Sequence, residues 1–488
     1  MTNSFPLINI LVLMITSFTA PLIRDYKKTS LLILSTSILL VASTGMTLVK
    51  TISNGYYILN IGHPDTFLGI QFHIGNAEAL ISFVFAIITL MTVIYSNSCI
   101  MDEIEENRIG LFYTLVNILV ASLLGVVYSN DLFNSYVFIE VSTLSACGLI
   151  VIKDKKENIK ATIKYLVMSS IGSGLVLMAI AYLYSISGHL NMSLISGVIA
   201  NNHMDYKNSI LIILTLFTVG LGVKSALFPL HGWLPDAHSS APAPSSALLS
   251  SMVIKVYIFM LIKMIFRMFT LEIVENTIIM DVILLLGSCG MIFGSVMAIN
   301  QKELKRMIAY SSIAQVGYIA FGLGIGSVAG MTIAVYHIIG HALTKSGLFL
   351  LSGLMIKKNN SKYIEDLKGI GREMPFALIL FALASFSMVG IPVFPGFISK
   401  WYLSLACIQI NRIPLILIIL ASSLLNLLYY FPIVINGFFG QNNLEGKIYN
   451  SKKIETAKIA PVAVLIILMT LTGLFSSTIL EMISKSFI

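Results

Sequence analysis

Long apolar stretches along the whole chain are the feature that most constrains how it can fold. A run of about 20 apolar residues is long enough to cross the hydrocarbon core of a bilayer as a helix. Only 11% of the 488 residues are charged, against about 25% in soluble domains. The pattern predicts one polytopic domain over residues 1–488, an all-α integral membrane protein with about 14 transmembrane helices. The runs lie at about 5–23, 31–49, 77–96, 110–129, 132–152, 162–186, 209–229, 244–266, 276–299, 308–327, 331–356, 375–410, 413–438 and 459–483.

Basic residues are distributed unevenly between the two sets of connecting loops. The loops on one side carry 21 Lys and Arg residues, whereas the opposite loops and the two termini carry 6. Cytoplasmic loops are enriched in basic residues, so we expect a multi-pass protein of a prokaryotic cytoplasmic (inner) membrane with both termini on the outer side. This asymmetry explains the formal net charge of +8, and we expect lipid rather than nucleic acid around the chain.

The cysteines indicate no cofactor site. Cys99, Cys147, Cys289 and Cys407 lie far apart and form no C-x-x-C pair, so we expect neither an iron–sulfur cluster nor a metal site here. Any redox chemistry would then belong to a partner subunit, and this chain would bind no cofactor.

One segment between the apolar runs has a different pattern. Residues 51–76 alternate in character and contain Gly and Pro breaks, which predicts a β-like excursion outside the membrane. Glu78 follows it, and Glu78 and Asp281 both lie near the ends of predicted helices. We expect both carboxylates at the membrane interface and assign them no role.

Four lysines fall inside predicted helices: Lys224, Lys255, Lys345 and Lys400. An ionisable group at the bilayer centre costs about 2.5–3.5 kcal/mol on insertion scales, so it should face the protein interior or water and have a partner. Glu140 is the carboxylate at similar depth, and we expect it to pair with Lys224. Burial favours a neutral amine and a nearby carboxylate favours the ammonium, so a small helix movement would release a proton. The alternative is a static ion pair that joins two helices.

The other buried basic residues suggest a relay. Lys255 has no carboxylate nearby in the sequence, and Lys400 would be the last group before an exit; the alternative for both is snorkelling to the interface. His337, His341 and Lys345 are spaced by four residues and share a helical face, and imidazoles exchange protons near neutral pH. The H-x-x-x-H spacing also permits zinc, but no Cys, Asp or Glu nearby completes such a site.

Two broken segments frame these residues. The seventh and twelfth runs each combine Gly, Pro and Lys, in "VGLGVKSALFPLHGWLP" and "SMVGIPVFPGFISKWYL". Paired interrupted helices in the two halves of a transporter indicate an inverted repeat with binding sites near the midplane. His231, Asp236 and His238 flank the first break on the predicted cytoplasmic side. They are candidates for proton intake or for a cluster that stabilises the loop.

The chain resembles the antiporter-like membrane subunits of respiratory complex I, Mrp cation/proton antiporters and membrane-bound hydrogenases. The resemblance rests on "YVFIEVSTLSACGLI", "KSALFPLHGWLPDAHSSAPAPSSALLSSMVIKVY", "YHIIGHALTKSGLFLLSG" and "GIPVFPGFISKWYL", and runs from about residue 65 to 435. It implies 14 helices, two inverted five-helix repeats at about 110–266 and 276–438, and breaks in helices 7 and 12. By motif, Glu140 matches the family's fifth-helix glutamate, and Lys224, Lys255 and Lys400 match its lysines of helices 7, 8 and 12. The chain departs from the family at "GNAEAL", where an aspartate is usual.

These observations predict a proton-translocating subunit of a redox-driven membrane complex, either a complex I-like NADH dehydrogenase or a membrane-bound hydrogenase. Glu140 and Lys224 would form the switch, and the other buried lysines and both histidines the relay. Its partners would be other membrane subunits, and the candidate ions are protons and, as a second ion, Na⁺. Two alternatives remain open: a subunit of a gradient-driven Na⁺/H⁺ (Mrp-type) antiporter, and a structural anchor for a redox arm.

Overall fold

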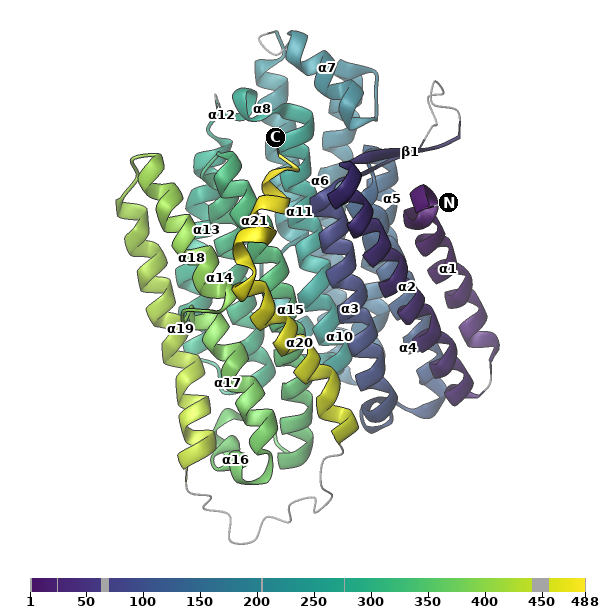
Figure 1. Cartoon of the computed structure of the whole chain (residues 1–488), viewed down its shortest axis with the longest axis vertical. Helices are drawn as coiled ribbons and strands as arrows, with labels where there is room; N and C mark the ends of the chain where they lie inside the picture. Colours follow the sequence, from purple (N-terminus) through teal and green to yellow (C-terminus); the bar gives the residue numbers. More distant parts are fainter. Residues whose placement is uncertain are drawn as a thin grey trace.

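The computed structural model describes residues 2–23, 25–62, 70–202, 205–275, 277–440 and 456–487, and almost all of them are helical (Figure 1). The first half contains α1 (Phe5–Thr19), α2 (Tyr26–Asn54), α3 (Asn76–Cys99), α4 (Glu106–Tyr128), α5 (Leu132–Val151), α6 (Lys156–Ser187), α7 (Met192–Asn202), α8 (Lys207–Lys224), α9 (Leu234–Ser240), α10 (Ala243–Leu248), α11 (Ile254–Met264) and α12 (Leu271–Glu275). The second half contains α13 (Ile279–Ile299), α14 (Leu304–Gly324), α15 (Val328–Asn359), α16 (Ile370–Glu373), α17 (Pro375–Val389), α18 (Pro395–Gln409), α19 (Pro414–Phe439), α20 (Thr456–Leu474) and α21 (Ser476–Ser484). The strands are β1 (Tyr57–Ile61) and β2 (Ile70–Ile74).

Most of the long helices can cross a membrane. In the described part of the chain, 12 spans are long and apolar enough, and the bent pair α20–α21 brings the number to 13. The expectation of a multi-pass, nearly all-helical membrane protein is therefore confirmed. α17 and α18, with 15 residues each, divide the apolar run expected at 375–410. The basic loop expected before α20 lies mostly in residues 441–455, outside the described residues.

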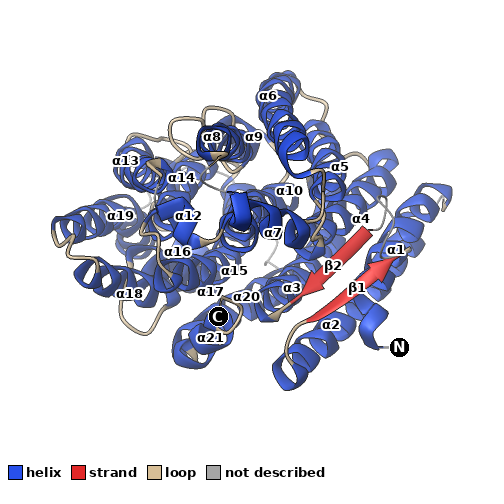
Figure 2. Cartoon of the chain, turned by 90° about the horizontal axis from the view of Figure 1, so that it is seen from above, coloured by secondary structure: helices blue, strands red, loops and turns tan. Residues whose placement is uncertain are grey.

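The centre of the bundle is formed by the span α10–α11 and by α14 and α15. In the apolar window of the first, 100% of the residues are buried, and in the other two 94%. The windows of α1, α2, α6 and α19 are only 33–39% buried, and these helices lie around the outside in the view from above (Figure 2). Lys255 on α11 and Lys345 on α15 therefore occupy the most enclosed helices of the molecule.

Glycines allow a close contact between α13 and α14. A Cβ added to Gly287 would lie 2.6 Å from the backbone nitrogen of Phe321, and one added to Gly317 would lie 2.7 Å from the carbonyl oxygen of Gly287. Small residues at such positions let membrane helices approach backbone to backbone. This contact fixes α14, which carries the serines described below.

The predicted excursion contains an antiparallel hairpin (Figure 2). Tyr57 lies opposite Ile74 and Ile61 opposite Ile70, while residues 63–69 of the expected segment lie outside the described residues. Glu78 follows the hairpin at the start of α3, as expected, but it is only 1% exposed. Its carboxylate lies 2.8 Å from the Arg267 guanidinium, which compensates for its burial.

Candidate functional site

Lys224 lies at the C-terminal end of α8, where the chain leaves the helix. The negative end of a helix dipole favours a cation at this position. The carbonyl of Val223 accepts a hydrogen bond from the Trp233 indole N–H at 2.9 Å, so the break does not leave that group unsatisfied. The Lys224 side chain is 0% exposed, and its Nζ donates to the Thr143 hydroxyl at 2.9 Å.

Glu140, on α5, is the carboxylate that pairs with Lys224. Its Oε1 lies 3.5 Å from Nζ and also accepts a hydrogen bond from the Ser173 hydroxyl on α6. Helix α6 reaches α8 closely because Gly172 faces Gly220, whose carbonyl oxygen lies 2.8 Å from the position of an added Cβ. The Glu140 side chain is 35% exposed in the isolated chain, which its predicted interior position did not anticipate.

Lys255 and Lys345 are fully buried and connected through neighbouring serines of α14. The Lys255 Nζ donates to the carbonyl of Ser250, which belongs to a π-helical turn of the kind found at functional sites. The Ser250 hydroxyl lies 3.2 Å from that of Ser312, and the Lys345 Nζ donates to the Ser311 hydroxyl at 2.5 Å. No carboxylate of the described residues forms an ion pair with either lysine.

His337 and His341 continue this line along α15, with ring centroids 5.7 Å apart. The Nδ1 of His337 lies 2.7 Å from the hydroxyl of Ser399, the residue before Lys400. A cavity of about 10 Å³ beside both rings has room for one water molecule. Within the described part of the chain, the amide nitrogen of Gln315, Nε2 of His337 and both ring nitrogens of His341 have no hydrogen-bond partner. A water in this cavity would connect the two rings.

Lys400 meets the C-terminal end of α17. Its Nζ donates to the carbonyls of Met388 and Val389 at 3.0 and 2.7 Å and lies 5.0 Å from the centroid of the Tyr318 ring. Gly390 has a φ of 93°, and a Cβ there would lie 3.1 Å from Nζ, so glycine suits both the backbone and the lysine. Each break therefore brings a lysine to the end of a half-helix, where transporters hold ions.

The three candidates for proton intake lie at different depths. Asp236, on α9, lies 2.7 Å from Lys164 and 2.8 Å from Arg306; burial acts to raise the pKa of Asp236, but the two cations lower it below its ordinary value. His238 is 0% exposed, and neither of its ring nitrogens has a partner among the described residues. His231 packs against phenylalanine rings.

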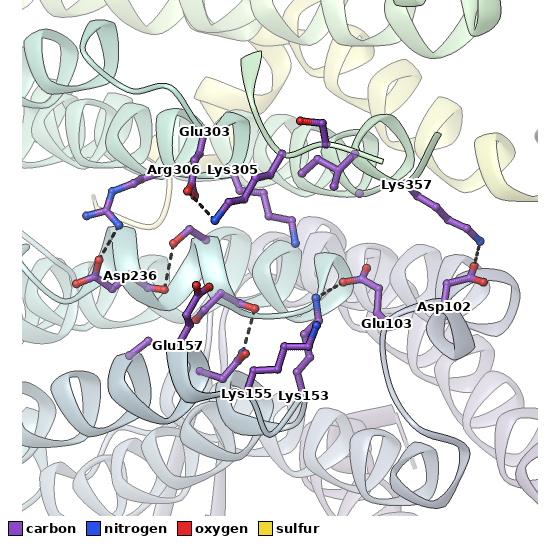
Figure 3. A pocket seen from close by; sticks show the side chains of 18 of the residues that line it. Asp102, Glu103, Lys153, Lys155, Glu157, Asp236, Glu303, Lys305, Arg306 and Lys357 are labelled. Atoms are coloured by element: carbon purple, nitrogen blue, oxygen red, sulfur yellow. Dashed lines mark hydrogen bonds and ion pairs between the residues drawn. The ribbon is translucent and has the colours of Figure 1, made fainter. Parts of the chain in front are cut away.

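Asp236 lines an open depression of about 1200 Å³, and many of the other side chains that line this depression are also charged (Figure 3). Two of them, Glu103 and Lys305, were not singled out from the sequence. Glu103 precedes α4 and lies 2.5 Å from the Lys153 ammonium, while Lys305 donates to the Ala241 carbonyl at 3.0 Å. Lys305 stands in "QKELKRM" at the start of a helix, a pattern typical of an interfacial lysine, so no residue pattern signals its burial.

Another buried cation lies toward the other end of α11. The Lys263 Nζ donates to the carbonyls of Val126, Val127 and Ser129 at 2.9–3.0 Å. These carbonyls lie at the C-terminal end of α4 and lack partners within that helix. Lys263, which is 2% exposed, therefore caps α4. In the part of the chain that the structure describes, no group of three or more His, Cys, Asp or Glu residues could hold a metal ion.

A family model for the transmembrane part of NADH:quinone oxidoreductase and Mrp antiporter subunits matches residues 129–426. The chain belongs to the NADH:quinone oxidoreductase/Mrp antiporter family. The matched range includes Glu140 and all four mid-helix lysines. The resemblance noted in the sequence is therefore confirmed, and the chain is an antiporter-like membrane subunit.

Relatives of this antiporter-like subunit come from both kinds of complex. It is 35% identical over 413 residues to NADH-quinone oxidoreductase subunit N of Desulforudis audaxviator, covering 83% of this chain and 80% of the relative. It is 29% identical over 394 residues to a subunit of the Na⁺/H⁺ antiporter of Alkalihalophilus pseudofirmus, covering 80% of this chain and 78% of the relative.

Two solved structures share the fold of this antiporter-like subunit. A chain of the membrane-bound sulfane sulfur reductase, an archaeal respiratory membrane complex, matches with a TM-score of 0.89 and 25% identity, covering 99% of this chain and 96% of that chain. A chain of the Mrp complex from a Dietzia species matches with a TM-score of 0.90 and 19% identity, covering 100% and 97%; at that identity the match supports the fold alone.

Proposed function

We propose that this antiporter-like subunit carries protons along its buried line of lysines and histidines. The observation that carries the proposal is the sequence of contacts from Lys255 through the serines of α14 to Lys345, and from His341 and His337 to Ser399 beside Lys400. Groups that bind and release protons within hydrogen-bond reach of one another, or through one water, can form a relay. The lysines and histidines of this line are at most 6% exposed, where ionisable residues are costly unless they serve a function.

The pair of Glu140 and Lys224 is the proposed switch. Two charges about 4 Å apart interact by roughly 4 kcal/mol at an effective dielectric near 20. A movement of α5 that separates the pair would remove this stabilisation of the ammonium, and Lys224 would pass its proton toward Lys255. Tyr257, two residues after Lys255, has its ring centroid 5.6 Å from the Lys224 Nζ. This contact between α8 and α11 supports a step between the two lysines.

Proton intake is proposed on the face that carries Asp236, with His231 and His238 behind it. The excess of basic residues in the loops of this face supports a cytoplasmic position, in a prokaryotic inner membrane. The N and C marks and β1 all lie in the upper part of Figure 1, at one end of the bundle, which supports both termini on one side of the membrane.

We also propose 14 spans in two inverted repeats, at about 110–266 and 276–438. α17 and α18 together form one broken span, which adds one to the 13 counted from the described residues. The repeats would place the broken spans α8–α9 and α17–α18 in corresponding positions. In each broken span a lysine lies at the end of the first half-helix: Lys224 at the end of α8 and the Lys400 ammonium at the end of α17. This likeness supports the equivalence of the two spans.

The energy source is proposed to be a redox reaction in partner subunits, without a cofactor in this chain. The 35% identity to subunit N of an NADH-quinone oxidoreductase and the likeness to a chain of a respiratory complex support it. The second candidate, a subunit of a Na⁺/H⁺ antiporter, is supported by the 29% identity to the Alkalihalophilus antiporter subunit. Whether Na⁺ moves with the protons separates the two.

The outer face of α5 supports a neighbouring membrane subunit as partner. Glu140 is 35% exposed there, and Val137 and Leu144, one turn to either side, are 44% and 64% exposed. A carboxylate that faced lipid at this depth would be unfavourable by about 2.5–3.5 kcal/mol. We infer that another subunit covers this face and supplies a polar or cationic group to Glu140.

One purification tests the assignment to a complex. The native assembly is isolated through a tag on this chain, its subunits are identified by mass spectrometry and its metals by elemental analysis. Iron, with or without nickel, is expected for a redox-driven complex. A metal-free assembly of small membrane proteins would instead support the gradient-driven antiporter.

The relay is tested with Lys224→Ala. The variant should assemble normally but lose proton uptake, because no other amine faces Glu140 among the described residues. Uptake is measured with a pH-sensitive dye in liposomes that contain the purified complex. Lys207→Ala, at the other end of α8, is the matched control and should retain uptake. Normal proton uptake by Lys224→Ala in an intact complex would contradict the proposed relay.

A further inference from the structure

Glu103 and Lys305 are two charged residues of the depression, and neither belongs to the proposed relay. Both line the cavity of about 1200 Å³, and both are labelled in Figure 3. Lys305 is 8% exposed and the Glu103 side chain 21% exposed, so they lie deep in an otherwise open, charged surface. Burial acts to raise the pKa of Glu103, but the positive charges of Lys305 and Lys153 lower it below the ordinary value.

Both side chains hold the same short piece of backbone. The N–H of Ala243 donates to the two carboxylate oxygens of Glu103 at 3.1 and 3.2 Å, and the Lys305 Nζ donates to the carbonyl of Ala241 at 3.0 Å. These residues form the turn between α9 and α10. The turn therefore connects the charged depression directly to the helices that carry the buried imidazole and the buried lysines.

The imidazole behind this turn is His238. It is fully buried, its backbone carbonyl accepts a hydrogen bond from the Ser246 hydroxyl at 2.8 Å, and its ring packs at 5.3 Å from the Phe349 ring. Within the described residues neither ring nitrogen has a partner, although buried polar groups are usually hydrogen-bonded. The ring belongs to α9, next to the turn that Glu103 and Lys305 hold, and it packs against α15, which carries Lys345. The ring therefore lies between the turn and the relay.

We propose that Glu103 and Lys305 are the proton inlet of the subunit and deliver protons to the relay through His238. The inference rests on the proposed function and names the first groups of its path. An N–H bond of the Lys305 ammonium breaks, and the proton moves to a ring nitrogen of His238. The Glu103 carboxylate accepts a proton from a hydronium ion of the aqueous phase and gives it to the neutral Lys305 amine, so both groups return to their starting charges. His238 passes the first proton to a buried lysine and becomes neutral again.

The same inference separates Asp236 from the inlet itself. Asp236 is held between the fixed charges of Lys164 and Arg306 on the wall of the depression. Arginine does not release a proton in proteins, so this pairing orders the wall and concentrates charge there. Glu103 instead pairs with Lys153 at 2.5 Å, and a lysine, unlike an arginine, can exchange a proton with a carboxylate.

Two substitutions test the inlet while keeping the contacts of the turn. In Glu103→Gln the amide oxygen still accepts from the Ala243 N–H but cannot be protonated, and in Lys305→Arg the guanidinium still donates to the Ala241 carbonyl but does not release a proton. Each should slow proton uptake at least about tenfold, within the contribution of a positioned proton-transfer group. Uptake is measured in liposomes with the purified complex, driven by the energy source of the wild-type assembly.

Controls distinguish the inlet from a purely structural turn. Asp102→Asn and Lys357→Arg alter the ion pair at the rim of the same depression and should leave uptake unchanged. Glu103→Asp keeps a titratable carboxyl but shortens the side chain, so it should retain more uptake than Glu103→Gln. A structural clamp predicts the reverse order, and that order would overturn the inlet, as would wild-type uptake by both Glu103→Gln and Lys305→Arg.

The outcome is independent of the test of the relay. If Lys224→Ala abolishes uptake while both inlet variants behave as wild type, the relay stands and only the inlet is wrong. If Lys224→Ala retains uptake, the proposed function itself fails, whatever the inlet variants do.

Discussion

At the scale of single residues, the buried lysines are held mainly by neutral groups. Lys255 and Lys400 donate to backbone carbonyls, and Lys345 donates to a carbonyl and a hydroxyl. A lysine with neutral partners can lose its proton without leaving an unpaired buried anion, so these groups suit transient neutrality. The sequence predicted these lysines because a charge inside an apolar run is visible there. Gly and Pro indicate the break whose carbonyls hold Lys400, but the π-helical turn that contains Ser250 leaves no residue-type signal.

Asp236 gives a prediction on the dependence of stability on pH. Because the pKa of Asp236 is lowered in the folded protein, its two ion pairs stabilise the fold fully above the ordinary aspartate pKa of about 3.9 and lose this effect as the pH falls below it. Asp236→Asn should therefore lower the free energy of unfolding at about pH 7 by about 1 kcal/mol or less for each partly exposed pair. This loss is measured as a lower Tm of the complex. The difference from wild type should shrink as the pH approaches the lower folded pKa.

Asp281→Asn is the matched control for this measurement. Asp281 has one partner, Arg412, and its side chain is 57% exposed, so its substitution should change the Tm less than that of Asp236. A Tm difference for Asp236→Asn that grows on acidification would contradict the pairing with Lys164 and Arg306.

At the scale of elements, the two broken spans determine where charge can lie in the membrane. Their positions could be predicted from Gly and Pro within apolar runs, as could the hairpin from its alternation. The groups that satisfy the free carbonyls at each break could not be predicted, because they belong to side chains that lie beyond the break in the sequence. The Trp233 indole reaches back over ten residues to the end of α8, and Lys400 reaches back to the end of α17.

Trp233→Phe tests how the first break is closed. Phenylalanine keeps most of the ring but removes the N–H that donates to the Val223 carbonyl, next to Lys224. The carbonyl then keeps the longer hydrogen bond from the Ala226 N–H, at 3.3 Å. Loss of the indole hydrogen bond should destabilise the subunit by about 0.5–1.5 kcal/mol, measured as a lower Tm of the purified complex. Trp401→Phe is the control, because Trp401 is 54% exposed, and its Tm should stay close to wild type. Equal Tm values for the two variants would show that the indole hydrogen bond does not support the break.

At the scale of the whole molecule, the chain has a line of polar groups within an apolar interior, and an outer face that is incomplete by itself. That the chain crosses the membrane many times, and that lysines and histidines lie inside its apolar runs, could be predicted from hydropathy and charge. The exposure of Glu140 could not, because hydropathy gives the depth of a residue but not the direction in which its helix face points. That direction is set by α6 and α8, which cover the Lys224 side of the pair and leave Glu140 at the edge.

A cross-linking experiment tests whether a neighbouring subunit covers this edge. Leu144→Cys, placed 64% exposed on α5, should form a cross-link to a co-purified membrane subunit with a short bifunctional maleimide, in a background where Cys147 is replaced by Ala. Ala146→Cys, at a fully buried position of the same helix, should form none. If Leu144→Cys in an intact complex reacts with the maleimide but forms no cross-link to another subunit, this face has no partner.

The three carbonyls that hold Lys263 also bear on how the chain is made. Ribosomes build a protein from its amino end, so Val126, Val127 and Ser129 leave the ribosome more than 130 residues before Lys263 does. The acceptors at the end of α4 are thus available when α11 is inserted, and the ammonium can exchange its water shell for them as it arrives. The order of the helices along the gene therefore helps a buried charge to be placed during synthesis.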